Sequence, residues 1–94
     1  MSESGQQQRE ICFAGHVQGV GFRYTVRSLA AGFEVTGFVR NLPDGRAQVV
    51  VEGSPREIDN FLDGIRQEMS HYIRTTRQTT LPATGRFHGF EIRH

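Results

Sequence analysis

The chain contains no lysine, and all eleven of its basic residues are arginine. This absence excludes every mechanism that requires a lysine, including the P-loop, whose motif places a lysine before its last serine or threonine. The formal net charge is only +1, so the chain has no long basic face that would bind nucleic acid without sequence preference. We therefore expect no nucleic-acid partner.

Cysteine and long apolar runs are scarce as well. Cys12 is the one cysteine, so no disulfide can form within the chain, and its place in the apolar stretch "ICFAG" predicts a buried strand residue. No apolar run approaches the roughly 20 residues of a membrane span, and the N-terminal "MSESGQQQRE" lacks the regions of a signal peptide. These absences predict a reduced, cytoplasmic protein without a membrane partner.

A length of 94 residues predicts one compact domain. We place this domain at residues 9–94, because residues 1–8 are polar and are expected to form a disordered tail. Alternating apolar residues predict a first strand from Arg9 to the glycines near Gly15.

The rest of the chain alternates between helical and strand patterns. Apolar residues at helical spacing predict a helix after the glycines that ends at Gly32, a suitable C-terminal cap. Strands at residues 34–41 and 46–53 are joined by a short Pro-Asp-Gly turn and should form an antiparallel hairpin. The stretch "SPRE" begins a second helix, with Ser54 as N-cap and Glu57 at the capping-box position. A fourth strand in "YIRTTRQTT" and a short fifth in "FEIR" follow.

This order of elements predicts an α+β fold. It is the βαββαβ arrangement of a ferredoxin-like α/β sandwich, with both helices on one face of a four- to five-stranded antiparallel sheet. Such a fold serves many functions, so the function must come from the site.

The stretch "GHVQGVGFR", Gly15 to Arg23, is a glycine-rich turn from a strand into a helix. Backbone N–H groups and a helix N-terminus in such a turn favour a phosphate. A dinucleotide-binding motif is excluded, because no third glycine follows Gly19 and Gly21 at the required spacing. Arg23 suits an oxyanion because its planar fork donates two parallel hydrogen bonds. From these residues alone, a solvated arginine after a plain turn remains an alternative.

Two segments together carry a specific resemblance. "GHVQGVGFR" and "GFVRNLPDGRAQVVVEG" resemble acylphosphatase, a family that hydrolyses the carboxyl–phosphate bond of acyl phosphates, from about Glu10 to Phe61 and again in the closing "GFEIR". The resemblance implies a hydrolase with a small-molecule acyl phosphate as substrate and inorganic phosphate as product and competitive inhibitor. It also implies a reaction that needs no metal and no cofactor. We expect a monomer.

The resemblance assigns the catalytic roles to Arg23 and Asn41. Arg23 would bind the phosphate oxygens, and the Asn41 amide would hold the attacking water. By itself Asn41 would be interpreted as a residue that caps the Pro-Asp-Gly turn. The backbone amides that would enclose the phosphate are those of Val17, Gln18, Gly19, Val20, Gly21 and Phe22.

The chain departs from the family pattern in two places. His16 stands where many members carry arginine or lysine, so any contribution to the local field would depend on pH, and an exposed strand-edge position is expected. The Gly-Pro segment common after the second helix is absent, so the resemblance does not predict the structure from about Glu68 to Phe87. The remaining histidines are spaced too irregularly for a zinc site and are expected at the surface. They are His71, His88 and His94.

Two alternative functions remain. One is a module that binds acyl or carbamoyl phosphate, or regulates a larger enzyme, without turnover of its own; a free-standing enzyme is favoured over it. The other is an RNA-recognition domain, which has the same order of elements, but its aromatic strand motif is missing from "TGFVRN".

Overall fold

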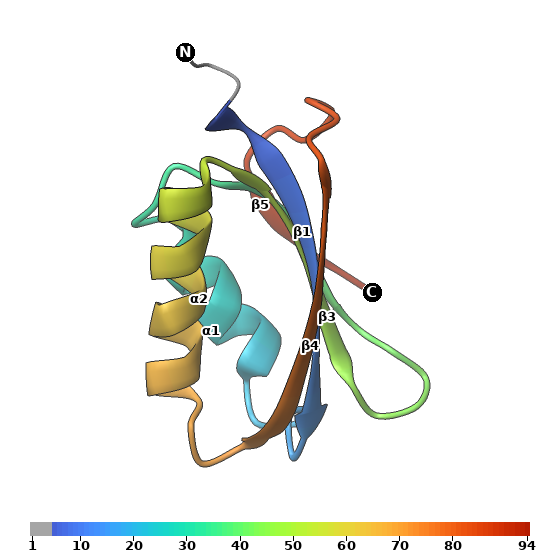
Figure 1. The fold of residues 1–94 in the computed structure, drawn as a ribbon. Helices are drawn as coiled ribbons and strands as arrows, with labels where there is room; N and C mark the ends of the chain where they lie inside the picture. Colours follow the sequence, from blue (N-terminus) through green and yellow to red (C-terminus); the bar gives the residue numbers. More distant parts are fainter. Residues whose placement is uncertain (1–4) are drawn as a thin grey trace.

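The computed structural model describes residues 5–94, which form two layers, a pair of helices on one face of a five-stranded sheet (Figure 1). The elements in chain order are β1 (Gln7–Gly15), α1 (Phe22–Ala30), β2 (Thr36–Asn41), β3 (Ala47–Gly53), α2 (Pro55–Glu68), β4 (Ile73–Pro82) and β5 (Phe90–Arg93). The predicted ferredoxin-like α+β fold is confirmed. Neither helix of the described part is long and apolar enough to cross a lipid bilayer.

The strands lie in the order β4-β1-β3-β2-β5. Pairs among the first four are antiparallel, whereas β5 runs parallel to β2. The prediction of an antiparallel sheet is therefore wrong for β5, and the sheet is mixed. The alternation in "FEIR" indicates a strand but carries no information on its direction. That direction follows from residues 83–89, which connect β4 at one edge of the sheet to β5 at the other.

The first strand begins at Gln7, two residues before the predicted start at Arg9. Gln7 and Gln8 pair with β3 and β4, so these two residues of the predicted tail belong to the sheet. Residues 1–4 of that tail lie outside the described residues. The first helix ends at Ala30 with Ala31 as C-cap, two residues before the predicted end at Gly32. Gly32 directly follows the C-cap, and its backbone N–H donates to the carbonyl of Leu29 at 3.0 Å.

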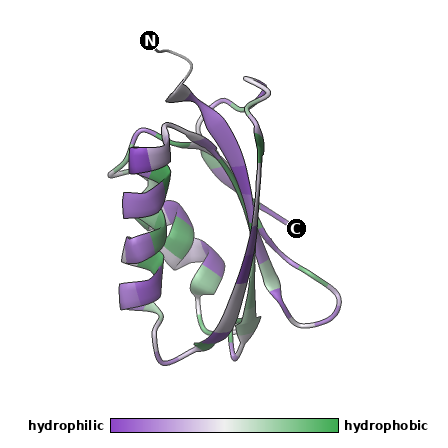
Figure 2. Cartoon of the chain, in the orientation of Figure 1, coloured by the Kyte–Doolittle hydropathy of each residue, from purple (hydrophilic) through white to green (hydrophobic). Residues whose placement is uncertain are grey.

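The core lies between the sheet and the helices, and Figure 2 shows that the hydrophobic residues of α2 lie on the side of this helix that faces the sheet. Ile11 and Phe13 of β1 are fully buried there. Because side chains alternate along a strand, Cys12 points to the opposite face of the sheet. It is only half-buried, so the prediction of a buried cysteine is wrong. The neighbouring residues Ile11 and Phe13 face the core instead.

The second helix begins as predicted. The Ser54 hydroxyl accepts a hydrogen bond from the backbone N–H of Glu57 at 3.2 Å, and Pro55 occupies the first turn. The Glu57 carboxylate accepts from the backbone N–H of Glu34 at 2.7 Å, which ties α2 to the segment before β2. The helix continues through Gly64, where the added Cβ of an alanine would lie 3.8 Å from Leu29 of α1.

Glu52 of β3 anchors the connection between β4 and β5. Its carboxylate is buried and accepts hydrogen bonds of 2.8–2.9 Å from the Gln8 amide, the Thr84 backbone and hydroxyl, and the Gly85 backbone. Burial by itself raises the pKa of a carboxyl, but these donors outweigh burial and hold the pKa of Glu52 below its usual 4.5. This carboxylate thereby fixes the path of the chain into β5.

Candidate active site

The glycine-rich loop lies between β1 and α1, at the lower end of the molecule in Figure 1. Gly19 and Gly21 have φ angles of +79° and +76°, in the left-handed region that favours glycine. A Cβ at either position would meet nothing within 4 Å, so the requirement for glycine is conformational. Gly21 is also the N-cap position of α1, and no side chain of the described residues caps the N-terminus of this helix.

The backbone amides of this loop point to no protein acceptor. None of the N–H groups of residues 17–22 donates a hydrogen bond to another described residue. Backbone N–H groups are obligatory donors, and Val17 is fully buried. A run of such groups at an uncapped helix N-terminus is suited to an anion.

A pocket of about 200 Å³ opens beside the loop. Its walls come from the loop, the first turn of α1, the end of β2, and the end of the chain through β5. It is lined by Val17, Gly19, Gly21, Phe22, Arg23, Tyr24, Asn41, Ile92 and His94. Arg23 and Asn41, which are 18 positions apart in the chain, therefore line the same pocket.

Arg23 is half-buried in the pocket wall. Its Nη1 donates to the backbone carbonyl of Arg93 at 3.4 Å and lies 3.0 Å from Nδ1 of His94. No hydrogen bond within the described residues involves its Nε or Nη2. These two nitrogens form the side-on edge of a guanidinium, which can donate two parallel hydrogen bonds to an oxyanion.

Asn41 is the last residue of β2, and its Oδ1 is buried without a hydrogen-bond partner in the described part of the chain. The turn that Asn41 was interpreted to cap is closed by another residue: the Asp44 carboxylate accepts from the Arg46 backbone N–H at 3.0 Å. That N–H holds the pKa of Asp44 below its usual 3.8. A buried acceptor without a partner costs about 1–3 kcal/mol, so this amide oxygen is expected to meet a ligand or water in the pocket.

Gln18 connects the loop to the hairpin. Its Nε2 donates to the carbonyl oxygens of Leu42 at 2.8 Å and Arg46 at 3.0 Å, which follow Asn41 in the chain. The sequence predicts only a backbone role for Gln18. Its side-chain partners are backbone carbonyls 24 and 28 positions away, which carry no sequence signal.

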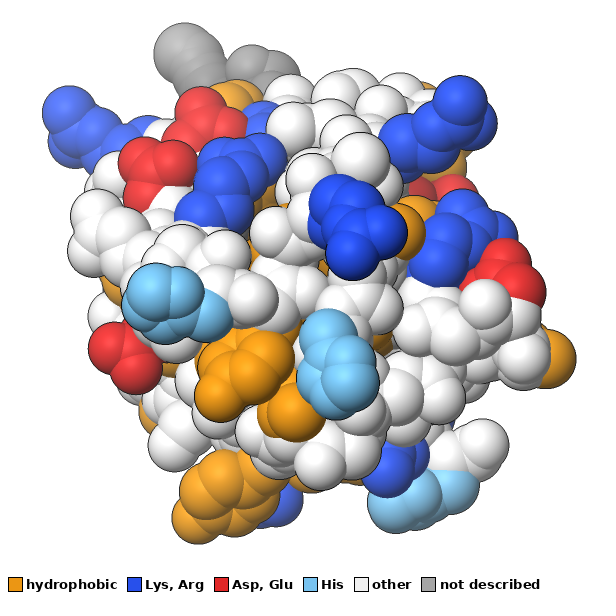
Figure 3. Space-filling view, turned by 90° about the horizontal axis from the view of Figure 1, so that it is seen from below, with side chains coloured by type: hydrophobic (Ala, Val, Ile, Leu, Met, Phe, Trp, Pro, Cys, Tyr) orange, Lys and Arg blue, Asp and Glu red, His pale blue; other side chains and the backbone are white. Residues whose placement is uncertain are grey.

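All four histidines lie at the surface as predicted, but one of them, His94, lines the pocket. His16 and His71 are exposed and line a separate hollow with Tyr72 and Arg74. Seen from below, Figure 3 shows histidine and hydrophobic side chains together on this end of the molecule. His94 is exposed and also lines the pocket of Arg23, which the sequence does not indicate. Within residues 5–94, no group of three or more His, Cys, Asp or Glu side chains is placed to hold a metal ion.

Comparison with known proteins identifies the family. The model of the family described as acylphosphatase matches residues 9–92. The chain belongs to the acylphosphatase family. Members of this family are hydrolases of acyl phosphates, so the resemblance seen in "GHVQGVGFR" and the hairpin is confirmed.

Acylphosphatases from several bacteria resemble the whole domain. The one from Acaryochloris marina is 35% identical over 79 residues, covering 84% of this chain and 85% of that protein. The one from Nocardia farcinica is 40% identical over 80 residues, covering 84% and 80%. The crystal structure of acylphosphatase from Bacillus subtilis has a TM-score of 0.84 at 28% identity, covering 94% of this chain and 99% of that one.

The acylphosphatase fold also occurs within longer chains. The structure of T. kodakarensis HypF matches with a TM-score of 0.80 at 27% identity, and the match covers 94% of this chain but 12% of HypF.

Proposed function

We propose that the pocket containing Arg23 and Asn41 is the active site in which this acylphosphatase hydrolyses its substrate. Water attacks phosphorus in line with the bond to the acyl oxygen, and the products are a carboxylate and inorganic phosphate. The observation that carries the proposal is that Asn41 and Arg23 line the same pocket, while Oδ1 of Asn41 and the Nε and Nη2 edge of Arg23 have no hydrogen-bond partner within the described residues.

The phosphate group binds to the loop. The unpaired N–H groups of residues 17–22 and the N-terminus of α1 surround its oxygens, and Nε and Nη2 of Arg23 donate to two of them. These donors neutralise the charge on the nonbridging oxygens as it redistributes in the transition state. Because the donors are fixed before the substrate arrives, little reorganisation is needed during the reaction.

The attacking water binds to Asn41. Its Oδ1 accepts one hydrogen of the water and thereby aims the oxygen at phosphorus. An amide cannot remove a proton, and no Asp or Glu side chain of the described residues lines the pocket, so in this proposal the proton passes to a phosphate oxygen of the substrate. The new bond joins the water oxygen to phosphorus, and the electron pair of the broken bond stays on the leaving carboxylate, which needs no protonation to depart.

The testing experiment is phosphate release from benzoyl phosphate in the presence of EDTA. We expect turnover by the wild type and its loss in Arg23→Ala. Arg27→Ala is the matched control, since Arg27 is exposed on the same helix and does not line this pocket. Wild-type turnover in Arg23→Ala would refute the site. Binding of inorganic phosphate by a wild type that does not hydrolyse would instead favour a binding or regulatory module.

Cytoplasmic location and a monomeric state remain predictions. Size-exclusion chromatography with light scattering tests the monomer, for which a mass near the 10.6 kDa of the chain is expected. A mass of twice that value would contradict it.

A further inference from the structure

His94 is the only histidine in the lining of the proposed active-site pocket within the described residues. Its Nδ1 lies 3.0 Å from Nη1 of Arg23, within hydrogen-bond distance. The backbone carbonyl of Arg93 accepts from the same nitrogen at 3.4 Å. The end of the chain therefore holds one terminal nitrogen of the Arg23 guanidinium through two consecutive residues.

The chemistry of the two groups defines the protonation state of this contact. A guanidinium carries only donors and stays charged at any working pH. Nδ1 of His94 must therefore be the acceptor, which requires a neutral imidazole with its proton on Nε2. In the protonated imidazole both ring nitrogens carry a proton. Nδ1–H of His94 would then lie against the N–H groups of Arg23 Nη1, which places two donors together and two positive charges side by side.

This contact determines which edge of Arg23 faces the ligand. Nη1 has two hydrogens, and the imidazole and the carbonyl of Arg93 can take one each. The guanidinium is then held through Nη1, and the side-on edge of Nε and Nη2 remains for an oxyanion. Without His94, only the long contact to the Arg93 carbonyl would restrain a side chain with several rotatable bonds.

We propose that neutral His94 is a positioning residue that orients Arg23 for the phosphate of the substrate, and that protonation of His94 releases Arg23. The inference rests on the role proposed for Arg23. It makes phosphate affinity depend on pH through a residue that need not touch the phosphate.

Within the described residues, no Asp or Glu side chain lines this pocket to hold the protonated imidazole in place. The other ionisable side chains of the lining are those of Arg23 and Tyr24. The side chain of the adjacent Arg93 donates to Glu91 at 2.9 Å and lies over the Phe38 ring, 3.9 Å from its centroid. An arginine side chain carries only donors, so that of Arg93 adds no acceptor for a protonated imidazole.

The test compares inhibition by inorganic phosphate, with benzoyl phosphate as substrate, in three proteins at pH 8 and pH 5. A histidine is neutral at the first pH and charged at the second. Phosphate itself titrates in this range, so the inhibition constant of each variant is divided by that of wild type at the same pH. The variants are His94→Ala, which removes the acceptor, and His94→Gln, which supplies an amide oxygen that does not titrate.

At pH 8 we expect His94→Ala to raise the inhibition constant of phosphate about 3- to 10-fold over wild type, the scale of one lost hydrogen bond. At pH 5 this ratio should approach one, because wild type has lost the contact as well. His94→Gln should match wild type at pH 8 and bind phosphate more tightly than wild type at pH 5. A role in folding alone would not produce this rescue.

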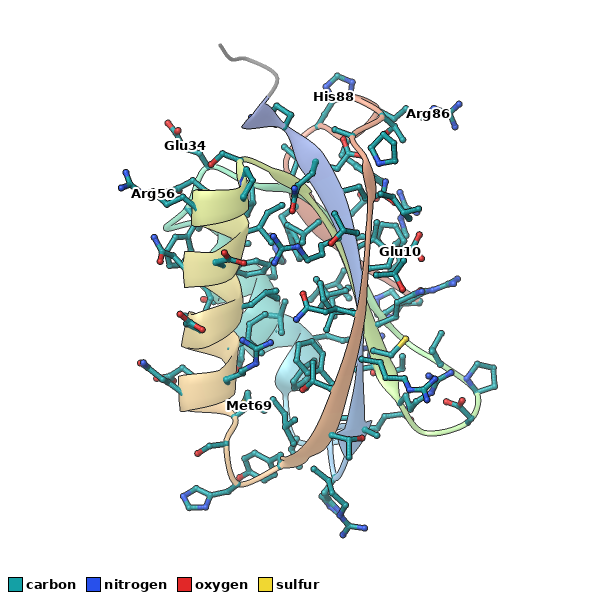
Figure 4. The ribbon with its side chains drawn as sticks, in the orientation of Figure 1. Glu10, Glu34, Arg56, Met69, Arg86 and His88 are labelled. Carbon is teal, nitrogen blue, oxygen red and sulfur yellow. The ribbon has the colours of Figure 1, made fainter. Side chains whose placement is uncertain are left out.

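His88→Gln is the matched control, since His88 is exposed at the other end of the sheet (Figure 4). It should follow wild type at both pH values. Equal phosphate affinity of His94→Ala and wild type at pH 8 would overturn the inference, and so would tighter binding by wild type than by His94→Gln at pH 5. Either result alongside an inactive Arg23→Ala would leave the site itself intact, whereas an active Arg23→Ala would refute the site.

A second readout is independent of activity. Nitrogen-15 spectra at pH 8 should show His94 in the Nε2–H tautomer in the wild type, since Nδ1 accepts from Arg23. Arg23→Ala should change the His94 tautomer signals and leave those of His88 unchanged. Unchanged His94 signals in Arg23→Ala would contradict the contact.

Discussion

Gln18 and Leu42 are joined by a 2.8 Å hydrogen bond from the side-chain amide of one to the backbone carbonyl of the other. The two residues belong to the loop and to the hairpin, the two segments that carry the proposed phosphate-binding and water-positioning groups. The same side-chain amide also donates to the backbone carbonyl of Arg46, on the other side of the hairpin turn. The Gln18 side chain therefore bridges the two halves of the site directly.

Replacement of Gln18 by alanine should loosen this connection. We expect Gln18→Ala to lower kcat about 10-fold and destabilise the protein by about 1–2 kcal/mol, because two hydrogen bonds between the loop and the hairpin are lost. Each carbonyl keeps one backbone donor, Gly45 N–H for Leu42 and Leu42 N–H for Arg46. Steady-state kinetics and urea unfolding measure the two effects. Gln67→Ala is the control, as Gln67 is exposed on α2. Unchanged kcat in Gln18→Ala would show that the amide does not align the site.

Gly19, one of the two loop glycines with a positive φ, should affect phosphate binding because its conformation directs the backbone N–H groups of the loop. Gly19→Ala meets no steric obstacle but strains a φ of +79°, which costs about 1–2 kcal/mol. Gly89→Ala is closely matched, with a φ of +78° and an equally open Cβ position. Similar losses of stability are expected in both variants, while only Gly19→Ala should weaken inhibition by phosphate. Equal phosphate inhibition in both variants would count against the backbone cradle.

Glu52 should make the free energy of unfolding depend on pH in the acidic range. Because the pKa of Glu52 in the folded protein lies below its usual 4.5, its contribution is complete above pH 4.5 and is lost as the pH falls through the lower value. Glu52→Gln should therefore cost about 1–3 kcal/mol at pH 7, and this difference should narrow below pH 4.5. Urea unfolding at pH 7 and in acid measures it. A difference that stays constant would show that the charge of Glu52 is not what holds residues 83–89.

Local pattern predicts the parts of the candidate site that are continuous in the chain. The glycines before a helix indicate an anion site, and Arg23 lies two positions after Gly21. Strand direction was beyond such patterns: β5 runs parallel to β2 because residues 83–89 cross the sheet, and that path depends on bonds to the buried Glu52. The position of His94 beside Arg23 follows from the same path, so a histidine expected only at the surface lines the pocket.

Asn41 shows a different limit. Its role as a turn cap and its role as a water ligand have the same sequence pattern, and only the family resemblance favours the second. The structure argues against the cap, because the Asp44 carboxylate accepts the hydrogen bond of the turn and Oδ1 of Asn41 has no partner within the described residues. The role as a water ligand stays a proposal. Cys12 was misplaced for a simpler reason, since an apolar stretch does not reveal which residues of a strand face the helices.

The most direct test of the proposed site is Asn41→Ala, assayed for kcat on benzoyl phosphate and for inhibition by inorganic phosphate. The account predicts a fall in kcat of about 10²–10³, the scale of one lost catalytic hydrogen bond, with the phosphate inhibition constant close to that of wild type. Stability should not fall, because the variant removes a buried oxygen that has no partner within the described chain. Asn60→Ala, an exposed position on α2, should behave as wild type. Wild-type kcat in Asn41→Ala would contradict the account.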